Sequence, residues 1–167
     1  MKNRHRQDCP VAAMMNVFGD RWSWLIIREA FYGATRFKEF EANTGIAKNL
    51  LADRLSILVD EGILKKTNIG QSGTRYAYSL TAKGKSLETI LIAMSQWGNE
   101  HIFGGAKAPV QIVERQTGKP VEKLQIRSED GRQLTMKDLA IMPGSKASKA
   151  TRHRLSQIDY SDEDTRS

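Results

Sequence analysis

Residues 37–66 read FKEFEANTGIAKNLLADRLSILVDEGILKK, and this stretch decides the fold. Two phenylalanines three residues apart predict a short helix over about residues 37–42, and Thr44-Gly45-Ile46 predicts a tight turn. Leucines at 51, 55 and 58 then share one face of a longer helix predicted over about residues 47–61, which Gly62 ends. A short helix, a glycine-containing turn and a longer amphipathic helix form the layout of a helix-turn-helix.

The residues after this stretch predict a β-hairpin. Residues 63–68 and 75–80 read as two strands, the second with alternating aromatic residues, and Gly70-Gln71-Ser72-Gly73 joins them with turn chemistry. A hairpin directly behind a helix-turn-helix is a wing, so the combination predicts a winged helix-turn-helix.

Further helices are predicted on both sides of this unit. Asp8-Cys9-Pro10 is a helix start, because a proline in the first turn needs no N–H partner, and that helix ends at Gly19-Asp20. A second helix is predicted over about residues 22–32, and a long one from Thr81 to about His101.

The chain beyond Gly104-Gly105 has a different character. Residues 110–115 and 121–127 read as short strands, and Asp130-Gly131 is a further turn signal. Residues 144–158 are basic and lack apolar periodicity, so a flexible arm is predicted there. The expected class is mainly α (α+β), with a winged helix-turn-helix over 1–105, a small β-rich extension over 106–143 and a flexible tail over 144–167.

Composition narrows the function without deciding it. The 167 residues carry 26 Lys and Arg against 19 Asp and Glu, a net charge of +7. This surplus is compatible with nucleic acid as a partner, but it divides into +4 for residues 1–105 and +3 for residues 106–167. The sequence has no apolar stretch of membrane-spanning length and no apolar signal core before Cys9, so a cytoplasmic protein without a membrane segment is expected.

The sequence offers no pattern for catalysis. The single cysteine excludes an internal disulfide and a structural zinc site, and His5, His101 and His153 are too dispersed for a metal site. Phosphate-cradling glycine loops and nucleophile elbows are absent from the sequence. We therefore expect neither an enzyme nor a cofactor or metal.

Five motifs in order carry a family resemblance. They are Cys9-Pro10-Val11, Gly19-Asp20-Arg21-Trp22, Gly33 with Arg36-Phe37-Lys38-Glu39-Phe40, Leu55 through Gly62-Ile63-Leu64, and Arg75-Tyr76-Ala77-Tyr78-Ser79-Leu80-Thr81. Over residues 9–103 the chain resembles the HxlR-type winged helix-turn-helix transcriptional regulators. The resemblance implies a homodimer, joined through its first and last helices, on a pseudo-palindromic operator in double-stranded DNA. It also implies a bacterial regulator that responds to reactive electrophiles, oxidants or aromatic metabolites in members with a known effector.

The helix that starts near Ala47 is the expected reader of DNA, because an α-helix fits the major groove and its first turns reach base edges. Wing residues would brace the backbone or the minor groove, and the start of the preceding helix would contact phosphate. The residues expected at DNA are Arg36, Lys38, Lys48, Asn49, Ala52, Arg54, Thr74 and Arg75. The alternative is a set of solvated charged faces, and Lys65 and Lys66 stay undecided.

Cys9 is a second candidate site. A cysteine at a helix amino terminus has its thiolate stabilised by N–H groups, and nearby Arg4, Arg6 and Arg21 would add to this field. Oxidants and electrophiles attack the thiolate, so Cys9 is a redox-sensing candidate. The alternative is an inert cysteine that fills a small space.

Apolar residues on the first and last helices are candidates for the dimer interface. These are Val11, Met15, Leu87, Ile90, Leu91, Met94 and Trp97. Trp97 and Phe103 are also candidates for lining an aromatic-ligand pocket, with core packing as the alternative. The rival functions are a winged-helix protein-interaction module and a small-molecule binder without specific DNA binding.

Overall fold

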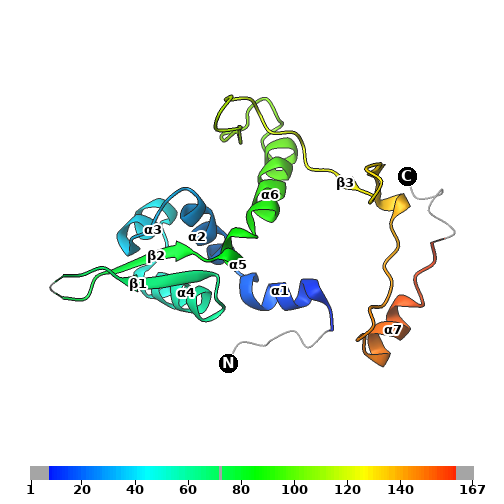
Figure 1. Ribbon diagram of the computed structural model, residues 1–167, viewed down its shortest axis with the longest axis horizontal. Coiled ribbons are helices and arrows are strands. Elements are labelled where there is room, and N and C mark those ends of the chain that lie inside the picture. Colours follow the sequence, from blue (N-terminus) through cyan, green and yellow to red (C-terminus); the bar gives the residue numbers. More distant parts are fainter. Residues whose placement is uncertain (1–7, 72, 161–167) are drawn as a thin grey trace.

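The computed structural model describes residues 8–71 and 73–160. A compact winged helix-turn-helix carries an upright helix, α6, and an extension that leads away from the wing (Figure 1). The elements follow in the order α1 (Pro10–Phe18), α2 (Arg21–Phe31), α3 (Phe37–Thr44), α4 (Lys48–Asp60), β1 (Leu64–Asn68), β2 (Tyr76–Leu80), α5 (Ala82–Lys85), α6 (Glu88–His101), β3 (Ile126–Arg127), β4 (Gln133–Leu134), the 3-10 helix η1 (Met136–Asp138) and α7 (Lys149–Leu155). The predicted fold class, mainly α with a winged helix-turn-helix, is confirmed.

The first two helices begin where the sequence predicted. Pro10 opens α1, and Asp20 caps α2 by accepting hydrogen bonds from the backbone N–H groups of Trp22 and Ser23, both at 3.0 Å. Ile26 and Ile27 of α2 are fully buried. The elements from α1 to α5, with Leu87, form the body of the protein. Because α2 packs against α1, α3, α4 and β2, it is the central helix of this body.

The helix-turn-helix surrounds the core of the body. Gly45 ends α3 in the left-handed region, with φ of 68°, which a residue without a side chain adopts readily. Phe40 of α3 and Leu51, Leu55 and Leu58 of α4 are all at most 1% exposed. The spacing of these leucines therefore buries the face of α4 that the sequence predicted.

The wing is an antiparallel hairpin whose register runs from Leu64 opposite Leu80 to Asn68 opposite Tyr76. The backbone N–H of Tyr78 donates to the carbonyl of Thr35 at 2.8 Å, which ties β2 to the turn before α3. Residue 72, at the tip predicted from the turn chemistry, lies outside the described residues.

The long helix predicted from Thr81 to His101 is divided in two. Thr81 caps α5, and α6 begins only at Glu88. Gly84 lies so close to the base of the wing that a Cβ there would be 2.2 Å from the carbonyl oxygen of Ile63. Leu87 is buried in the core at 8% exposure. The backbone turns at Ser86–Leu87 because α5 packs on the wing, whereas α6 leaves the body.

Residues 106–160, which include α7 and are called the extension from here on, have little regular structure of their own. Of the strands predicted at 110–115 and 121–127, the structure contains one isolated bridge, between Val113 and Pro120, and the short strand β3. β3 pairs with β4 around the predicted Asp130-Gly131 turn. In the segment predicted to be a flexible arm the structure contains α7, whose N-cap Ser148 accepts from the N–H of Thr151 at 3.2 Å.

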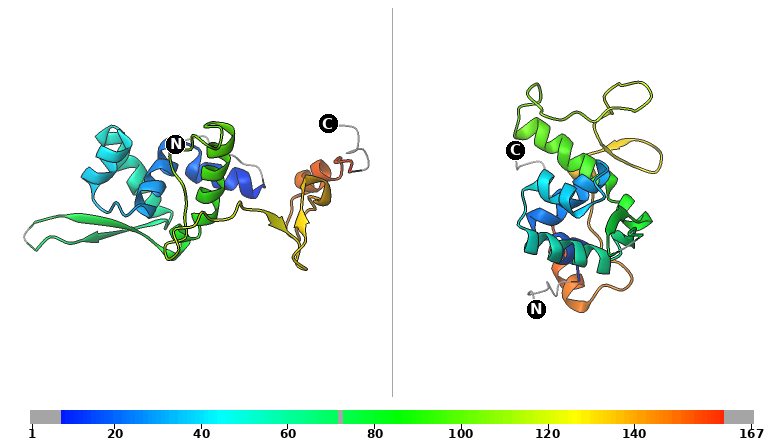
Figure 2. Two further views of the ribbon diagram at one scale, coloured as in Figure 1. Left: turned by 90° about the horizontal axis from the view of Figure 1, so that it is seen from above. Right: turned by 90° about the vertical axis from the view of Figure 1, so that its left-hand side faces the viewer.

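The wing and the distal part of the extension, from β3 to α7, lie at opposite ends of the long axis, and two perpendicular views agree on this (Figures 1 and 2). The distal end of the extension returns to the start of α1. There Asp8 accepts a hydrogen bond from the N–H of Ser148 at 2.8 Å, and the hydroxyl of Thr151 donates to the carbonyl of Asp8 at 3.3 Å.

Candidate nucleic-acid interface

The outer face of α4 carries small and polar side chains. Lys48, Asn49 and Ala52 are exposed, as the sequence predicted, and Ser56 continues the same face one turn later. The N-cap residue Ala47 makes no side-chain hydrogen bond to the first N–H groups of α4. Those N–H groups carry the positive end of the helix dipole, which suits a phosphate oxygen.

Arg54 lies on the opposite, inner side of α4. The sequence predicted it as a DNA contact, but it is only 7% exposed. Its Nη1 lies 3.1 Å from Oδ2 of Asp20, and its Nη2 lies 3.3 Å from Oδ2 of Asp53. Arg54 falls three residues after Leu51 and four before Leu58, so it shares their buried face. Its burial and its ion pair with Asp20 give it a structural part in holding α4 on α2.

Asp20 compensates the charge of the buried Arg54 guanidinium. Its carboxylate accepts from the Ser23 hydroxyl at 2.7 Å as well as from two backbone N–H groups and Arg54. Partial burial tends to raise the pKa of Asp20, but the bonds from Ser23 and the charge of Arg54 outweigh it, so the pKa lies below its usual value. The ionised carboxylate thus fixes the start of α2 and the middle of α4 together.

The wing carries the second group of residues that were predicted to contact DNA. Thr74 and Arg75 are both exposed next to the tip. Oδ1 of Asn68 accepts from the N–H of Gly70 at 3.0 Å and from the N–H of Arg75 at 3.3 Å, so one side chain closes the loop. Nζ of Lys66 lies 3.9 Å from the ring centroid of Tyr76, a cation–π contact that holds this lysine over the hairpin.

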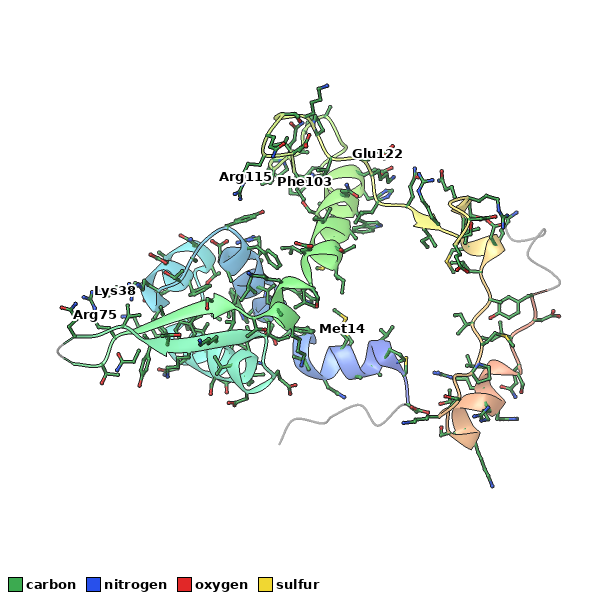
Figure 3. The ribbon with its side chains drawn as sticks, in the orientation of Figure 1. Met14, Lys38, Arg75, Phe103, Arg115 and Glu122 are labelled. Atoms are coloured by element: carbon green, nitrogen blue, oxygen red, sulfur yellow. The ribbon has the colours of Figure 1, made fainter. Side chains whose placement is uncertain are left out.

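The start of α3 carries the third group of residues that were predicted to contact DNA. Arg36 and Lys38 are exposed, and Lys38 and Arg75 both project at the wing end of the body (Figure 3). Glu39 accepts from the N–H groups of Thr35 and Arg36 at 2.7 and 2.9 Å, and these bonds lower the pKa of its carboxyl. Glu39 therefore fixes the turn that carries Arg36 and Lys38.

Cys9 caps α1 and is partly exposed. The backbone N–H groups of Ala12 and Val11 lower the pKa of its thiol, partial burial opposes them, and the charge of Arg154 on α7 lowers it further. Of the arginines predicted to act on this thiol, Arg4 and Arg6 lie outside the described residues, and Arg21 stacks on Trp22 with its guanidinium carbon 5.2 Å from the ring centroid.

The candidates for a dimer interface fall into two sets. Val11 and Met15 on α1 and Ile90, Met94 and Trp97 on α6 are exposed, with Val11 at 66% and Trp97 at 60%. Leu87 belongs to the core instead, and Leu91 is half-buried on the side of α6 that faces α2. None of the residues of α6 is buried within the described chain.

Sequence reasoning missed three residues of these sites. Ser56 could have been found by continuing the exposed face of α4 by one turn. Asp20 and Arg154 have no local signal, because Asp20 acts on a residue 34 positions away and Arg154 lies at the far end of the extension.

Metal-ligand clusters and membrane-spanning helices are both absent from the described residues. The described residues contain no group of three or more His, Cys, Asp or Glu side chains placed to hold a metal ion. Within residues 8–71 and 73–160, no helix combines the length and apolarity that crossing a membrane requires.

The families and proteins that the chain resembles are also helix-turn-helix proteins. The sequence model of a family described as HxlR-like helix-turn-helix matches residues 17–104, more than half of the chain. A Mycobacterium tuberculosis protein named as an uncharacterised HTH-type transcriptional regulator, Rv3095, is 29% identical over 134 residues, which cover 80% of this chain and 85% of the relative.

Two solved structures resemble the chain at different lengths. The candidate transcription factor PA1607 has a TM-score of 0.76 at 43% identity and covers 81% of this chain and 95% of its own. The redox regulator HypR, in its reduced form, has a TM-score of 0.51 at 30% identity and covers 56% of this chain and 96% of its own. Because residues 1–104 make up less than two thirds of the chain, the match to PA1607 includes part of the extension.

Proposed function

The chain belongs to the HxlR-like helix-turn-helix family of transcriptional regulators, which are not enzymes, and from that membership we propose that it is a homodimeric regulator that binds double-stranded DNA in a sequence-specific way. Its place of action is the cytoplasm, where bacterial DNA lies. The target is a pseudo-palindromic operator with half-sites about one helical turn apart, near 34 Å, or a multiple of it.

The observation that carries this proposal is the exposed face of α4. Lys48, Asn49 and Ala52 stand together on the first turns of the helix, while the leucines and Arg54 on its other side fix it to the body. Asn49 is suited to a bidentate contact with adenine, and Lys48 to guanine or phosphate. Arg75 and Thr74 on the wing, with Arg36 and Lys38 at α3, would meet the flanking backbone.

The dimer part of the proposal depends on the exposed apolar residues of α1 and α6. A 14-residue helix with Ile90, Met94 and Trp97 on its surface and no buried residue leaves apolar area for a partner to cover. A second copy of the chain fits the two-fold symmetry that a pseudo-palindromic operator requires.

The proposed regulation is a response of Cys9 to oxidants or electrophiles. Its lowered pKa gives more thiolate at neutral pH, and the thiolate is the reactive species. The likeness to the redox regulator HypR supports the same proposal. Since the chain has one cysteine, the product would be a bridge between two subunits or an adduct with a small thiol or electrophile.

The DNA-binding proposal is tested by selecting bound duplexes from a random pool and measuring affinity against salt. Asn49→Ala should weaken binding to the selected sequence by about 1–3 kcal/mol and relax its preference at one position. Lys48→Ala should lower the salt slope by about one, while Lys85→Ala, an exposed lysine on α5, should leave it unchanged. A chain that enriches no sequence and binds no duplex at low salt would refute the proposal.

A further inference from the structure

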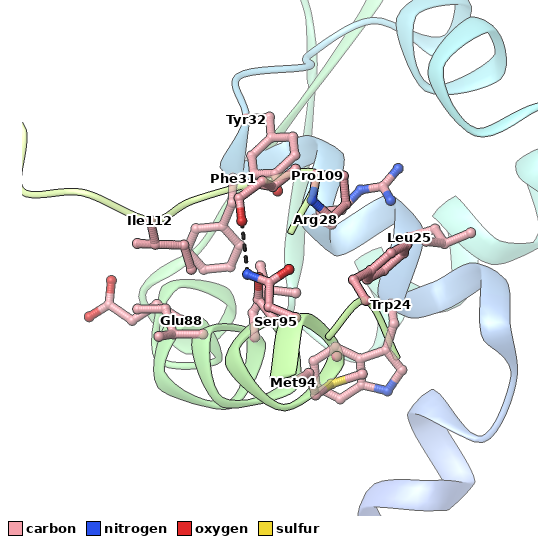
Figure 4. Close-up of a pocket in the computed structure, with 16 residues that line it drawn as sticks. Trp24, Leu25, Arg28, Phe31, Tyr32, Glu88, Met94, Ser95, Pro109 and Ile112 are labelled. Carbon is pink, nitrogen blue, oxygen red and sulfur yellow. Dashed lines mark hydrogen bonds between the residues drawn. The ribbon is translucent and has the colours of Figure 1, made fainter. Parts of the chain in front are cut away.

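A cavity of about 490 Å³ lies between α2 and α6 and is closed on a third side by the first residues of the extension (Figure 4). α2 contributes the aromatic rings of Trp24 and Phe31 to its lining, and the residue that ends it, Tyr32, contributes a third ring. α6 contributes Leu91 and Ser95, and the extension contributes Pro109 and Ile112. The volume falls in the range of small-molecule sites, about 300–1,000 Å³.

Hydrogen bonds from α6 hold the extension over this cavity. Nδ2 of Asn99 donates to the carbonyl of Val110 at 2.8 Å, the bond drawn in Figure 4. One turn earlier, Gln96 donates to the carbonyl of Glu122 and accepts from the N–H of Leu124, both at 2.9 Å. The third wall is therefore anchored to α6, and it lies beyond residue 104, where the family match ends.

The charged groups at the cavity argue against an anionic ligand. Nε and Nη2 of Arg28 both bond to Oε1 of Glu29, at 2.9 and 2.6 Å. Glu29 is buried and also accepts from Asn43 at 2.8 Å, so it holds the Arg28 guanidinium in an ion pair. The remaining charged side chain of the lining, Glu88, would repel an anion.

We propose that this cavity is a binding site for a small uncharged aromatic molecule. Aromatic rings from α2 offer faces and edges for stacking at centroid separations of about 4.5–7 Å. The hydroxyl of Ser95 and the amide of Asn99 supply the few polar groups that orient such a ligand.

The position of the cavity links its contents to DNA binding, a step that rests on the proposed function. α2 lines the cavity with one face and packs against α4 with another. α6 lines it with one face and exposes Ile90 and Trp97 on another. A ligand between the two helices sets the angle of α6 relative to the body, and in a dimer joined through α6 this sets the separation of the two α4 helices.

The test uses the full chain and N-phenyl-1-naphthylamine, an uncharged aromatic dye whose fluorescence rises in apolar sites. We expect saturable binding of one dye per chain, and weaker binding of the anionic 1-anilinonaphthalene-8-sulfonate. Gly98 lines the cavity, and a Cβ there would meet nothing within 4 Å, so Gly98→Phe fills the space without moving the backbone. It should lower dye affinity at least about tenfold. Ser95→Phe is a second filling variant, and Ala42→Phe, on the exposed side of α3, is the matched control.

Equal dye affinity in Gly98→Phe, Ser95→Phe and the wild type would overturn the site. So would absence of saturable binding together with a Gly98→Phe variant that no longer dimerises, because a side chain of the second copy would then fill the cavity. Dye binding needs no DNA, so its failure is distinct from failure of the DNA-binding proposal. An affinity for the dye that is the same with and without saturating operator would overturn the coupling, because linked sites change each other's affinity by one common factor.

Discussion

The body and the extension are stabilised by different kinds of interaction. Every buried hydrophobic residue among those described lies between Ala12 and Leu87, and residues 88–160 contain no buried residue. The body is stabilised by a core that its own chain fills. The extension is held by side-chain hydrogen bonds at its two ends, to Gln96 and Asn99 near α6 and to Asp8 near α1. A segment that buries so little apolar area gains little hydrophobic stabilisation of its own, so its order depends on what it is attached to.

The largest expected difference between the two regions is in the cost of losing an apolar side chain. Phe40→Ala removes a fully buried ring and should lower the free energy of unfolding by about 3–5 kcal/mol. Met136→Ala, in the extension, removes a side chain that is 70% exposed and should change it by less than about 0.5 kcal/mol. Urea unfolding of both variants measures this. A large cost for Met136→Ala would contradict the contrast and would mean that the extension is buried against a second copy.

Removing an ion pair should also cost more stability in the body than in the extension, but the difference should be smaller than for an apolar side chain. Arg54→Ala removes the buried partner of Asp20 and should cost about 2 kcal/mol, less than a fully buried pair because Asp20 is partly exposed. Arg132→Ala breaks the pair with Asp130 at 2.8 Å, in which both side chains are mostly exposed, and should leave stability unchanged within error. Thermal unfolding of both variants tests this, and equal losses would contradict it.

The buried core of the body explains how much of the fold the sequence could predict. The leucine spacing of α4, the proline at the start of α1 and the turn chemistry after β1 are local patterns, so the helix-turn-helix and the wing were predicted correctly. Arg54 was expected on the polar face of the helix with Lys48, Asn49 and Ala52, but its position between Leu51 and Leu58 places it on the buried face. The pairing that permits this burial joins residues 34 positions apart, and no local pattern encodes it.

The extension was predicted less well for a related physical reason. Short strands without a core depend on contacts that sequence alternation does not specify, so the strands predicted at 110–115 and 121–127 reduce to one bridge and β3. The short helix α7 depends on the cap from Ser148 more than on apolar periodicity. The walls of the cavity come from α2, α6 and the extension, and only the fold brings them together.

The pH dependence of stability should separate the two regions further. Folding lowers the pKa of Asp20 in the body, through Ser23 and Arg54 against the effect of burial, and that of Glu100 on α6, through Lys123. Each ionised group therefore stabilises the fold above its unfolded pKa, about 4, and this stabilisation is lost as the pH falls through the lower folded pKa. The stability gap between wild type and Asp20→Asn should narrow in acid and persist in 0.5 M salt. The gap for Glu100→Gln should vanish in that salt, because exposed pairs are screened.

The smallest expected effect occurs at Cys9, where the distal extension meets the body. Because the N–H groups of Ala12 and Val11 are the larger causes of the lowered pKa, most of the shift belongs to α1 itself, and Arg154 adds a smaller share across the junction. The rate of Cys9 alkylation against pH should have its midpoint below that of the urea-unfolded chain. Arg154→Ala should raise this midpoint slightly, whereas Lys149→Ala, also on α7, should leave it in place. An unchanged midpoint in Arg154→Ala would mean that the charge of Arg154 does not act on Cys9 in solution. A raised midpoint would make the reactivity of the one cysteine depend on where the extension lies, so that any partner that displaces α7 also changes the thiol.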